Sequence, residues 1–230
     1  MIKNFLFNDN CVNIYQFGSR VYGSNNKNSD YDYIVVVKEK VISTDINIHV
    51  YTIQEFEHLL DNHEIQTLEC VFSPKNFVLK ENHKFNVTID KTKLRTSIST
   101  ISSNSWVKGK KKLIVLGDYD LNAGLKSVFH SLRILDFGIQ IALHGKIVDF
   151  GSMNYILSDV TKMSENYSHI ELWNAIDTKY RPLYNSKNTE FKKLCPKDIV
   201  ETTKRAKIKE WLKSKGIDEP QYVEELLQIL

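Results

Sequence analysis

The spacing of apolar residues changes partway along the chain. The first part carries short runs in which apolar positions alternate with polar ones or follow one another, a pattern that predicts strands. These predicted strands are residues 11–18, 31–38 and 45–52, the last with one polar face. Residues 53–62 predict an amphipathic helix, and residues 65–72 predict either a short helix or a strand. Residues 76–90 predict irregular or weakly β-structured chain.

The second part has the longer, helical spacing of apolar residues. Its predicted helices are residues 93–116, 123–143, 151–166, 168–179 and 196–215, with a last one opening at 219–220 and running to 230. We expect a break at Arg181-Pro182, because proline lacks a backbone N–H, and an end at Gly216. The pattern predicts an α+β fold: a small mixed β-sheet head with flanking helices (residues 1–92), followed by a helical C-terminal half (residues 93–230).

Composition narrows the class of protein without assigning a function. Of 230 residues, 42% are apolar and 26% are charged, as in an ordinary globular protein, and a net charge of +3 does not by itself indicate nucleic-acid binding. The three cysteines are far apart, which is typical of reduced, intracellular thiols. No apolar run reaches the length of a membrane span. We therefore expect a cytoplasmic protein with no membrane partner, and no pattern indicates its oligomeric state.

The most informative segment is QFGSRVYGSNNKNSDYDYIVVV, residues 16–37. Asp30 and Asp32 are two positions apart, so on a strand both carboxylates face one side and offer ligands to Mg²⁺. Gly18 lets the backbone approach a ligand, and backbone N–H groups with the Ser19 hydroxyl can hold a phosphate. The alternative is a surface turn in which both carboxylates are merely solvated.

Gly-Ser followed by Ser-Asp-x-Asp ahead of an apolar strand resembles the signature of the DNA polymerase β-like nucleotidyltransferase superfamily. The resemblance implies that Gly18 and Ser19, with Arg20 beside them, contact the nucleotide phosphates. It also implies that Asp30 and Asp32 hold two Mg²⁺ (or Mn²⁺) ions that activate a hydroxyl for attack on the α-phosphate of an NTP.

The superfamily usually carries a third acidic residue on the following strand, and here three residues compete for that position. Asp45, Asn47 and His49 share a face by strand alternation. Asn47 falls nearest the expected position but is a poor metal ligand, whereas Asp45 lies one repeat earlier and His49 can accept a proton near neutral pH. We take Asp45 as the third catalytic and metal residue, with Asn47 and His49 as alternatives. All three could also be the polar side of a half-exposed strand.

Two basic clusters lie in the helical half. Lys126, His130 and Arg133 share one helical face, which suits either a triphosphate or solvent. The other cluster lies beside Trp106 and suits either a nucleic-acid backbone or a solvated helix face. Its members are Lys108, Lys110, Lys111 and Lys112.

The segments YTIQEF, LECVF and KSVFHSLRILDFGIQIALHGKI resemble the nucleotidyltransferases found with bacterial and viral RNA-repair genes. That resemblance implies transfer of an NMP from an NTP to a hydroxyl on an RNA end of the tRNA kind. Two other functions remain open: nucleotidylation of a protein or small molecule, and a non-catalytic nucleotide or RNA sensor, which Asn47 would favour.

Overall fold

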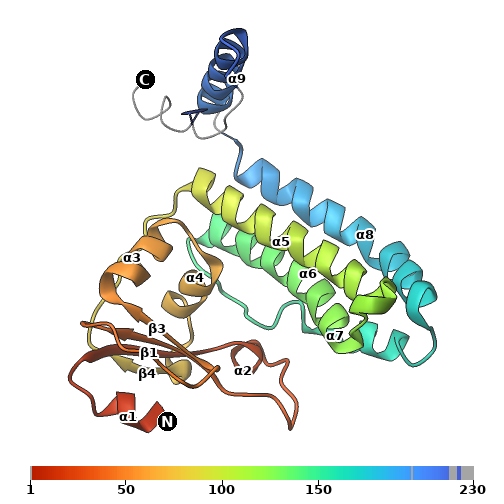
Figure 1. The fold of residues 1–230 in the computed structure, drawn as a ribbon. Helices are drawn as coiled ribbons and strands as arrows, with labels where there is room; N and C mark the ends of the chain where they lie inside the picture. Colours follow the sequence, from red (N-terminus) through yellow and green to blue (C-terminus); the bar gives the residue numbers. More distant parts are fainter. Residues whose placement is uncertain (1, 198, 218–221, 224–230) are drawn as a thin grey trace. The chain divides into compact units, whose positions relative to one another are not determined.

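The computed structural model describes residues 2–197, 199–217 and 222–223 (Figure 1). The chain forms two compact units, Met1–Cys195 and Pro196–Leu230. The first unit contains a mixed four-stranded sheet with flanking helices and then a bundle of long helices, so the predicted α+β fold is confirmed. The predicted division at residues 92/93 lies within this unit and stays a prediction.

Four strands form the sheet in the order β3–β2–β1–β4. They are β1 (Cys11–Phe17), β2 (Asp32–Val37), β3 (Ile48–Thr52) and β4 (Val78–Glu81). Strand β1 is antiparallel to both β2 and β4, whereas β2 and β3 are parallel. Phe17 pairs with Asp32 and Tyr33 pairs with Ile48, so β1 ends beside the start of β2. Strand β4 lies in the segment predicted to be irregular or weakly β.

Alternation along β2 directs its side chains into two separate cores. Ile34 and Val36 pack into the large core shared with the helices, whereas Val35 and Val37 face the short helix α1 (Ile2–Leu6) on the other side. Asp32 has the same parity as Ile34, so it faces the helical side. Helices α3 (Ile53–Asp61) and α4 (Ile65–Val71) also pack into the large core. Residues 65–72, for which the sequence left helix and strand open, therefore form a helix.

The third strand begins later than the sequence predicts, and the start expected at Asp45 is wrong. Asp45 Oδ1 accepts a hydrogen bond from Asn47 N at 3.0 Å, which forms a local turn before β3. The strand therefore starts at Ile48, and Asp45 lies outside it.

Three long helices and one shorter helix build the second part of the first unit, and the three long ones lie side by side in Figure 1. They are α5 (Lys91–Ile114), α6 (Leu121–His144), α7 (Asn154–Met163) and α8 (His169–Leu194). The short 3-10 turn Leu116–Asp118 joins α5 to α6. Gly138 of α6 has Ile98 of α5 and Phe191 of α8 within 3 Å of where a Cβ would lie, so its lack of a side chain lets the three helices pack closely.

The predicted break at Arg181-Pro182 is wrong, because α8 continues through Pro182 to Leu194. A proline inside a helix leaves the carbonyl four residues earlier without its N–H partner. That residue is Thr178, which is exposed like Pro182, so water can satisfy the carbonyl. Buried aromatic residues on both sides of Pro182, Tyr180 and Tyr184, stabilise the continuous helix against the bundle.

The second unit contains α9 (Ile199–Ser214), and Gly216 follows it with a positive φ of 72°. Ile208 and Leu212 of α9 pack with Val223 in a small core of their own. The helix predicted from 219–220 to 230 lies outside the described residues apart from 222–223. None of the described helices is long and apolar enough to span a membrane.

The close packing around Gly138 gives a stability prediction. Gly138→Val should lower the free energy of unfolding by about 2 kcal/mol or more, because the new side chain would displace two fully buried neighbours. Urea denaturation measures the change. Gly117→Val is the matched control, since no atom lies within 4 Å of a Cβ at that position. Equal losses in the two variants would contradict the packing argument.

Candidate active site

The turn after β1 brings the backbone at Gly18 against the carboxylate of Asp32. Gly18 has φ of 82°, and a Cβ built there would lie 2.6 Å from Asp32 Oδ2. A side chain at this position would therefore both strain the backbone and displace the carboxylate. Ser19 begins the short helix α2 (Ser19–Tyr22), and among the described residues no hydrogen bond uses its hydroxyl.

Arg20 fixes the loop that carries Asp30. Its Nε donates to the Asp30 carbonyl at 3.1 Å, and its Nη2 donates to the Ser29 carbonyl at 2.7 Å. The guanidinium also lies 3.7 Å from the centre of the Tyr31 ring. These contacts hold the two aspartates at the same end of β2, whereas the phosphate contact expected of Arg20 stays a prediction.

Asp32 lies in an electrostatic environment that favours a bound cation. Partial burial raises the pKa of its carboxyl above the usual range, and the charge of Asp30 raises it further. His49 and Lys126 oppose this shift but do not cancel it. A divalent cation between the two carboxylates would supply the missing positive charge, so this donor pair fits Mg²⁺, which needs few protein ligands beside phosphate and water.

The residues competing for the third position lie at different places. Tyr33 N donates to the Asn47 carbonyl at 2.8 Å, so Asn47 lies level with Asp32 at the edge of the pairing. His49 is exposed, pairs with Ile34, and has its ring 5.7 Å from the Phe17 ring. Asp45 is engaged in its turn with Asn47 N. Among the described residues, His49 is thus the one of the three whose charge influences Asp32.

Within the described part of the chain, no three His, Cys, Asp or Glu side chains gather as a metal-ligand cluster. Asp30 and Asp32 are two carboxylates close enough to interact, and their role as metal ligands stays a prediction. The predicted role of Asp45 as a third ligand stays a prediction, and its turn contact argues for a different use of that carboxylate.

The three predicted basic residues of α6 are not in equivalent surroundings. Lys126 is exposed and acts on Asp32, so it borders the carboxylate pair. Arg133 Nη2 donates a hydrogen bond to His130 Nδ1 at 2.7 Å. Burial, Arg133 and Lys108 lower the pKa of His130 to about 3, so its imidazole is neutral at physiological pH.

Arg133 is buried and belongs to a cluster that the sequence did not predict. Its guanidinium lies 3.4 Å from the centre of the Tyr22 ring and 3.6 Å from Glu69 Oε1. The Tyr22 hydroxyl donates to Glu69 Oε2 at 2.5 Å. This cluster joins α2, α4 and α6 behind the Gly18 turn, and Arg133 is too buried (2% exposed) to offer its charge at the surface. A glutamate inside the apolar run LECVF was the one signal that could have indicated it.

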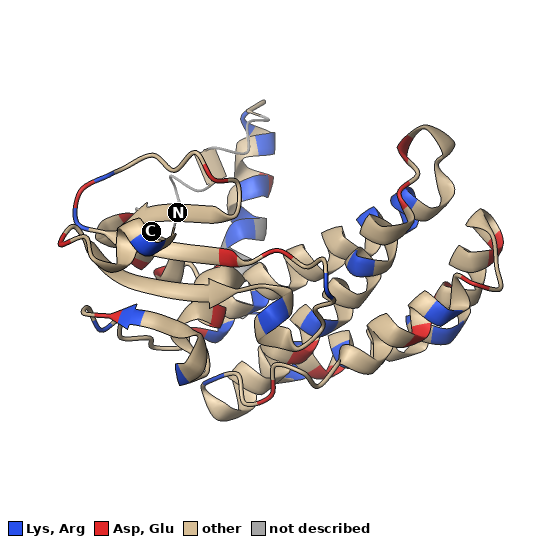
Figure 2. Ribbon diagram, turned by 90° about the horizontal axis from the view of Figure 1, so that it is seen from below, with Lys and Arg blue, Asp and Glu red and all other residues tan. Residues whose placement is uncertain are grey.

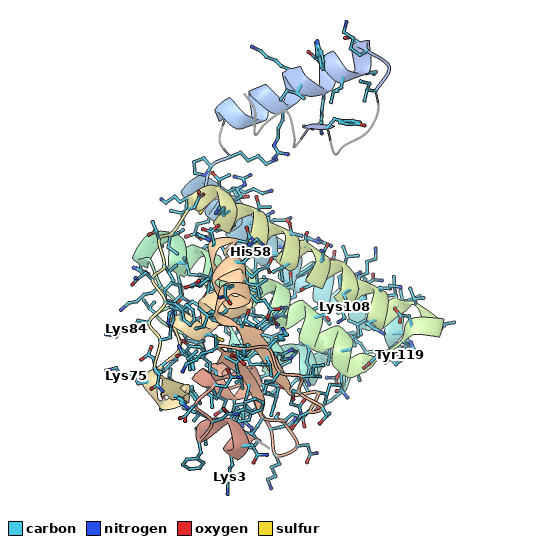
Figure 3. All side chains as sticks on the ribbon, turned by 60° about the vertical axis from the view of Figure 1, so that its left-hand side comes forward. Lys3, His58, Lys75, Lys84, Lys108 and Tyr119 are labelled. Carbon is cyan, nitrogen blue, oxygen red and sulfur yellow. The ribbon has the colours of Figure 1, made fainter. Side chains whose placement is uncertain are left out.

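The lysines of α5 also separate into two groups. Lys111 and Lys112 both pair with Asp118, whereas Lys108 and Lys110 are exposed, and Lys108 is labelled in Figure 3. Trp106 is buried against Trp173 and Tyr184 and cannot stack on a base. Figure 2 shows basic and acidic positions interspersed along the long helices rather than one continuous basic face.

Comparison with known proteins adds one finding. Residues 2–95 match the family model of the nucleotidyltransferase domain. The match covers the sheet, the Gly18 turn, both aspartates and the start of α5, and it supports nucleotidyl transfer as the general activity, with an NTP as substrate. No curated protein and no solved structure matches the chain.

The neutral, largely buried His130 of α6 gives a pH prediction. An unfolded histidine gains a proton near pH 6.5, whereas the folded one resists protonation down to about pH 3, so acidification favours the unfolded chain. We expect stability to fall by about 1–2 kcal/mol between pH 7 and pH 5 from this group. In His130→Asn this part of the loss should disappear. Denaturant titrations at both pH values measure it, with the exposed His144→Asn as control; identical pH dependence in the wild type and His130→Asn would contradict the argument.

Proposed function

We propose that this protein transfers an NMP from an NTP to a hydroxyl on an RNA end, releasing pyrophosphate. The observation that carries the proposal is the contact between the Gly18 turn and the Asp32 carboxylate, with Asp30 close enough to raise the Asp32 pKa. A backbone able to contact phosphate thus lies directly beside two carboxylates that favour a cation. The family match over residues 2–95 supports the transferase chemistry.

In this proposal Asp30 and Asp32 hold two Mg²⁺ or Mn²⁺ ions. Bound divalent metal lowers the pKa of an attacking hydroxyl and neutralises charge on the phosphates. The Gly18 backbone and the Ser19 hydroxyl bind the β- and γ-phosphates, and Arg20 keeps the Asp30 loop in position. Lys126 lies near enough to Asp32 to add positive charge where the pyrophosphate leaves.

His49 is our proposed residue for the third position. It is exposed, lies on the same sheet face as Asp32 and influences its charge, so its imidazole can accept the proton of the incoming hydroxyl. Asn47, level with Asp32, can orient that hydroxyl through its amide. Asp45 acts in this scheme by fixing the turn that presents Asn47.

The acceptor is proposed from charge and resemblance. We propose that the helical half, from residue 93 onward, forms a domain of its own that contacts the acceptor. Its exposed Lys108 and Lys110 suit the phosphate backbone of a nucleic acid. The resemblance to RNA-repair nucleotidyltransferases also favours an RNA end. The three separate, buried cysteines fit the reducing cytoplasm that we propose as the location.

An incorporation assay tests transfer and acceptor together. Purified protein with Mg²⁺ or Mn²⁺ and each α-labelled NTP should label total RNA, and Asp30→Ala should reduce labelling by at least about a hundredfold, as expected for loss of a catalytic metal ligand. A protein-only lane identifies self-labelling. Label on protein alone would show that the acceptor is a protein and not RNA.

The third position is tested by three matched substitutions. If His49 acts there as a base, His49→Ala should lower kcat by about a hundredfold or more. His49→Asp should retain more activity than His49→Ala, whereas Asp45→Asn should change kcat little. A large loss in Asp45→Asn with normal His49→Ala would return the role to Asp45.

A non-catalytic sensor is the second candidate, favoured by the neutral Asn47 level with Asp32. Such a protein would bind Mg²⁺–NTP without turnover. A rise in melting temperature with Mg²⁺–NTP that requires Asp30 and Asp32, alongside no incorporation into any acceptor, would support the sensor and exclude the transferase.

A further inference from the structure

The second unit of the chain carries a basic helix with an exposed tryptophan. Residues 204–215 have the sequence KRAKIKEWLKSK, in which six residues are basic and one is acidic. Trp211 is 53% exposed, whereas Trp106 and Trp173 are 3% and 5% exposed. An indole left in water on a strongly basic helix requires an explanation, because large aromatic side chains are usually buried.

The positions of the lysines relative to Trp211 are regular. Lys207 and Lys215 lie four residues before and after it, so the three side chains follow one stripe of α9 and its last turn. Each lysine is displaced by about 6 Å from Trp211 along the helix axis. All three are exposed, and among the described residues no carboxylate pairs with either lysine.

The apolar side of the helix is already used within its own unit. Ile208 and Leu212 are buried against Val223, and among the α9 side chains that the structure describes Trp211 is the large apolar one that is exposed. A helix that lies in a membrane surface needs an apolar face to insert, and the described side chains of residues 207–214 leave none free. The two lysine cations on either side of the Trp211 ring instead match a nucleic-acid single strand, in which a base can stack on the indole and the neighbouring phosphates carry negative charge.

We propose that the stripe formed by Lys207, Trp211 and Lys215 binds single-stranded nucleic acid, with a base stacked on Trp211 and flanking phosphates on the two lysines. Base–aromatic stacking combined with basic side chains is the usual means of holding a single strand without reading its sequence. This inference rests on the proposed function, because it identifies the bound strand as part of the RNA acceptor. The second unit thereby supplies a contact for the acceptor strand through its own helix.

The test uses the full chain, EDTA and no NTP, so that binding is measured apart from transfer. Anisotropy of a fluorescein-labelled twelve-nucleotide single-stranded RNA gives the Kd, beside a duplex of the same length. Trp211→Ala should weaken binding of the single strand about tenfold, and Trp211→Phe should weaken it less. RNA should also quench the emission of the exposed Trp211, and this quenching should vanish in Trp211→Phe.

A charge-matched pair of variants separates the stripe from general basicity. Lys207→Glu/Lys215→Glu changes the stripe, whereas Lys209→Glu/Lys213→Glu makes the same change about 160° around the helix. The first double variant should lose at least about five times more affinity than the second. Equal losses, wild-type binding by Trp211→Ala, or binding to phosphatidylserine vesicles in place of RNA would each overturn the proposal.

The same variants distinguish this inference from the proposed function. RNA binding that depends on Trp211, without any NMP incorporation, would contradict the proposed transferase activity and support RNA binding by the stripe. If NMP incorporation into RNA is unchanged in Trp211→Ala and in Lys207→Glu/Lys215→Glu, the transferase proposal is supported and RNA binding by the stripe is contradicted.

Discussion

The buried ion pair between Arg133 and Glu69 is the interaction on which the arrangement of the first unit depends. Charges are costly to bury, and this pair is sheltered by the Tyr22 ring and hydroxyl. It connects the helix that follows the Gly18 turn to the sheet-covering helix α4 and the central helix α6. The Gly18 turn is therefore braced from behind by the helical bundle, and Asn154 of α7 adds a hydrogen bond to the Tyr22 carbonyl at 2.6 Å.

Local sequence patterns predicted most of the framework and the central motif. Strands β1 and β2 and helices α3 and α6 follow the apolar periodicity closely, because burial on one face dictates that spacing. The sequence motif joined Gly18 and Asp32 in one predicted site, and the antiparallel pairing of β1 with β2 brings the two together. Strand β4 was not, because its short alternating run acquires strand structure only by pairing with β1.

Features that depend on distant neighbours could not be predicted from local pattern. Arg133 shares a helical face with Lys126 by spacing, but only the packed position of α4 shows that this end of the face is covered. Pro182 indicates a helix break by local chemistry, and tertiary packing on both sides overrides it. The competition among Asp45, Asn47 and His49 depended on strand register, which a side-chain–backbone hydrogen bond in the preceding turn determines.

The continuity of α8 through Pro182 has a mechanical consequence. A proline removes one rung from the ladder of backbone hydrogen bonds, so bending at that level strains one hydrogen bond fewer than bending elsewhere in the helix. The helix is thus softer toward its solvent side at Thr178 than anywhere in its two flanking segments, each of which is anchored by buried aromatic residues. When the bundle bends, α8 should bend at the level of Pro182. The two segments of α8 can then tilt relative to each other without either one unfolding.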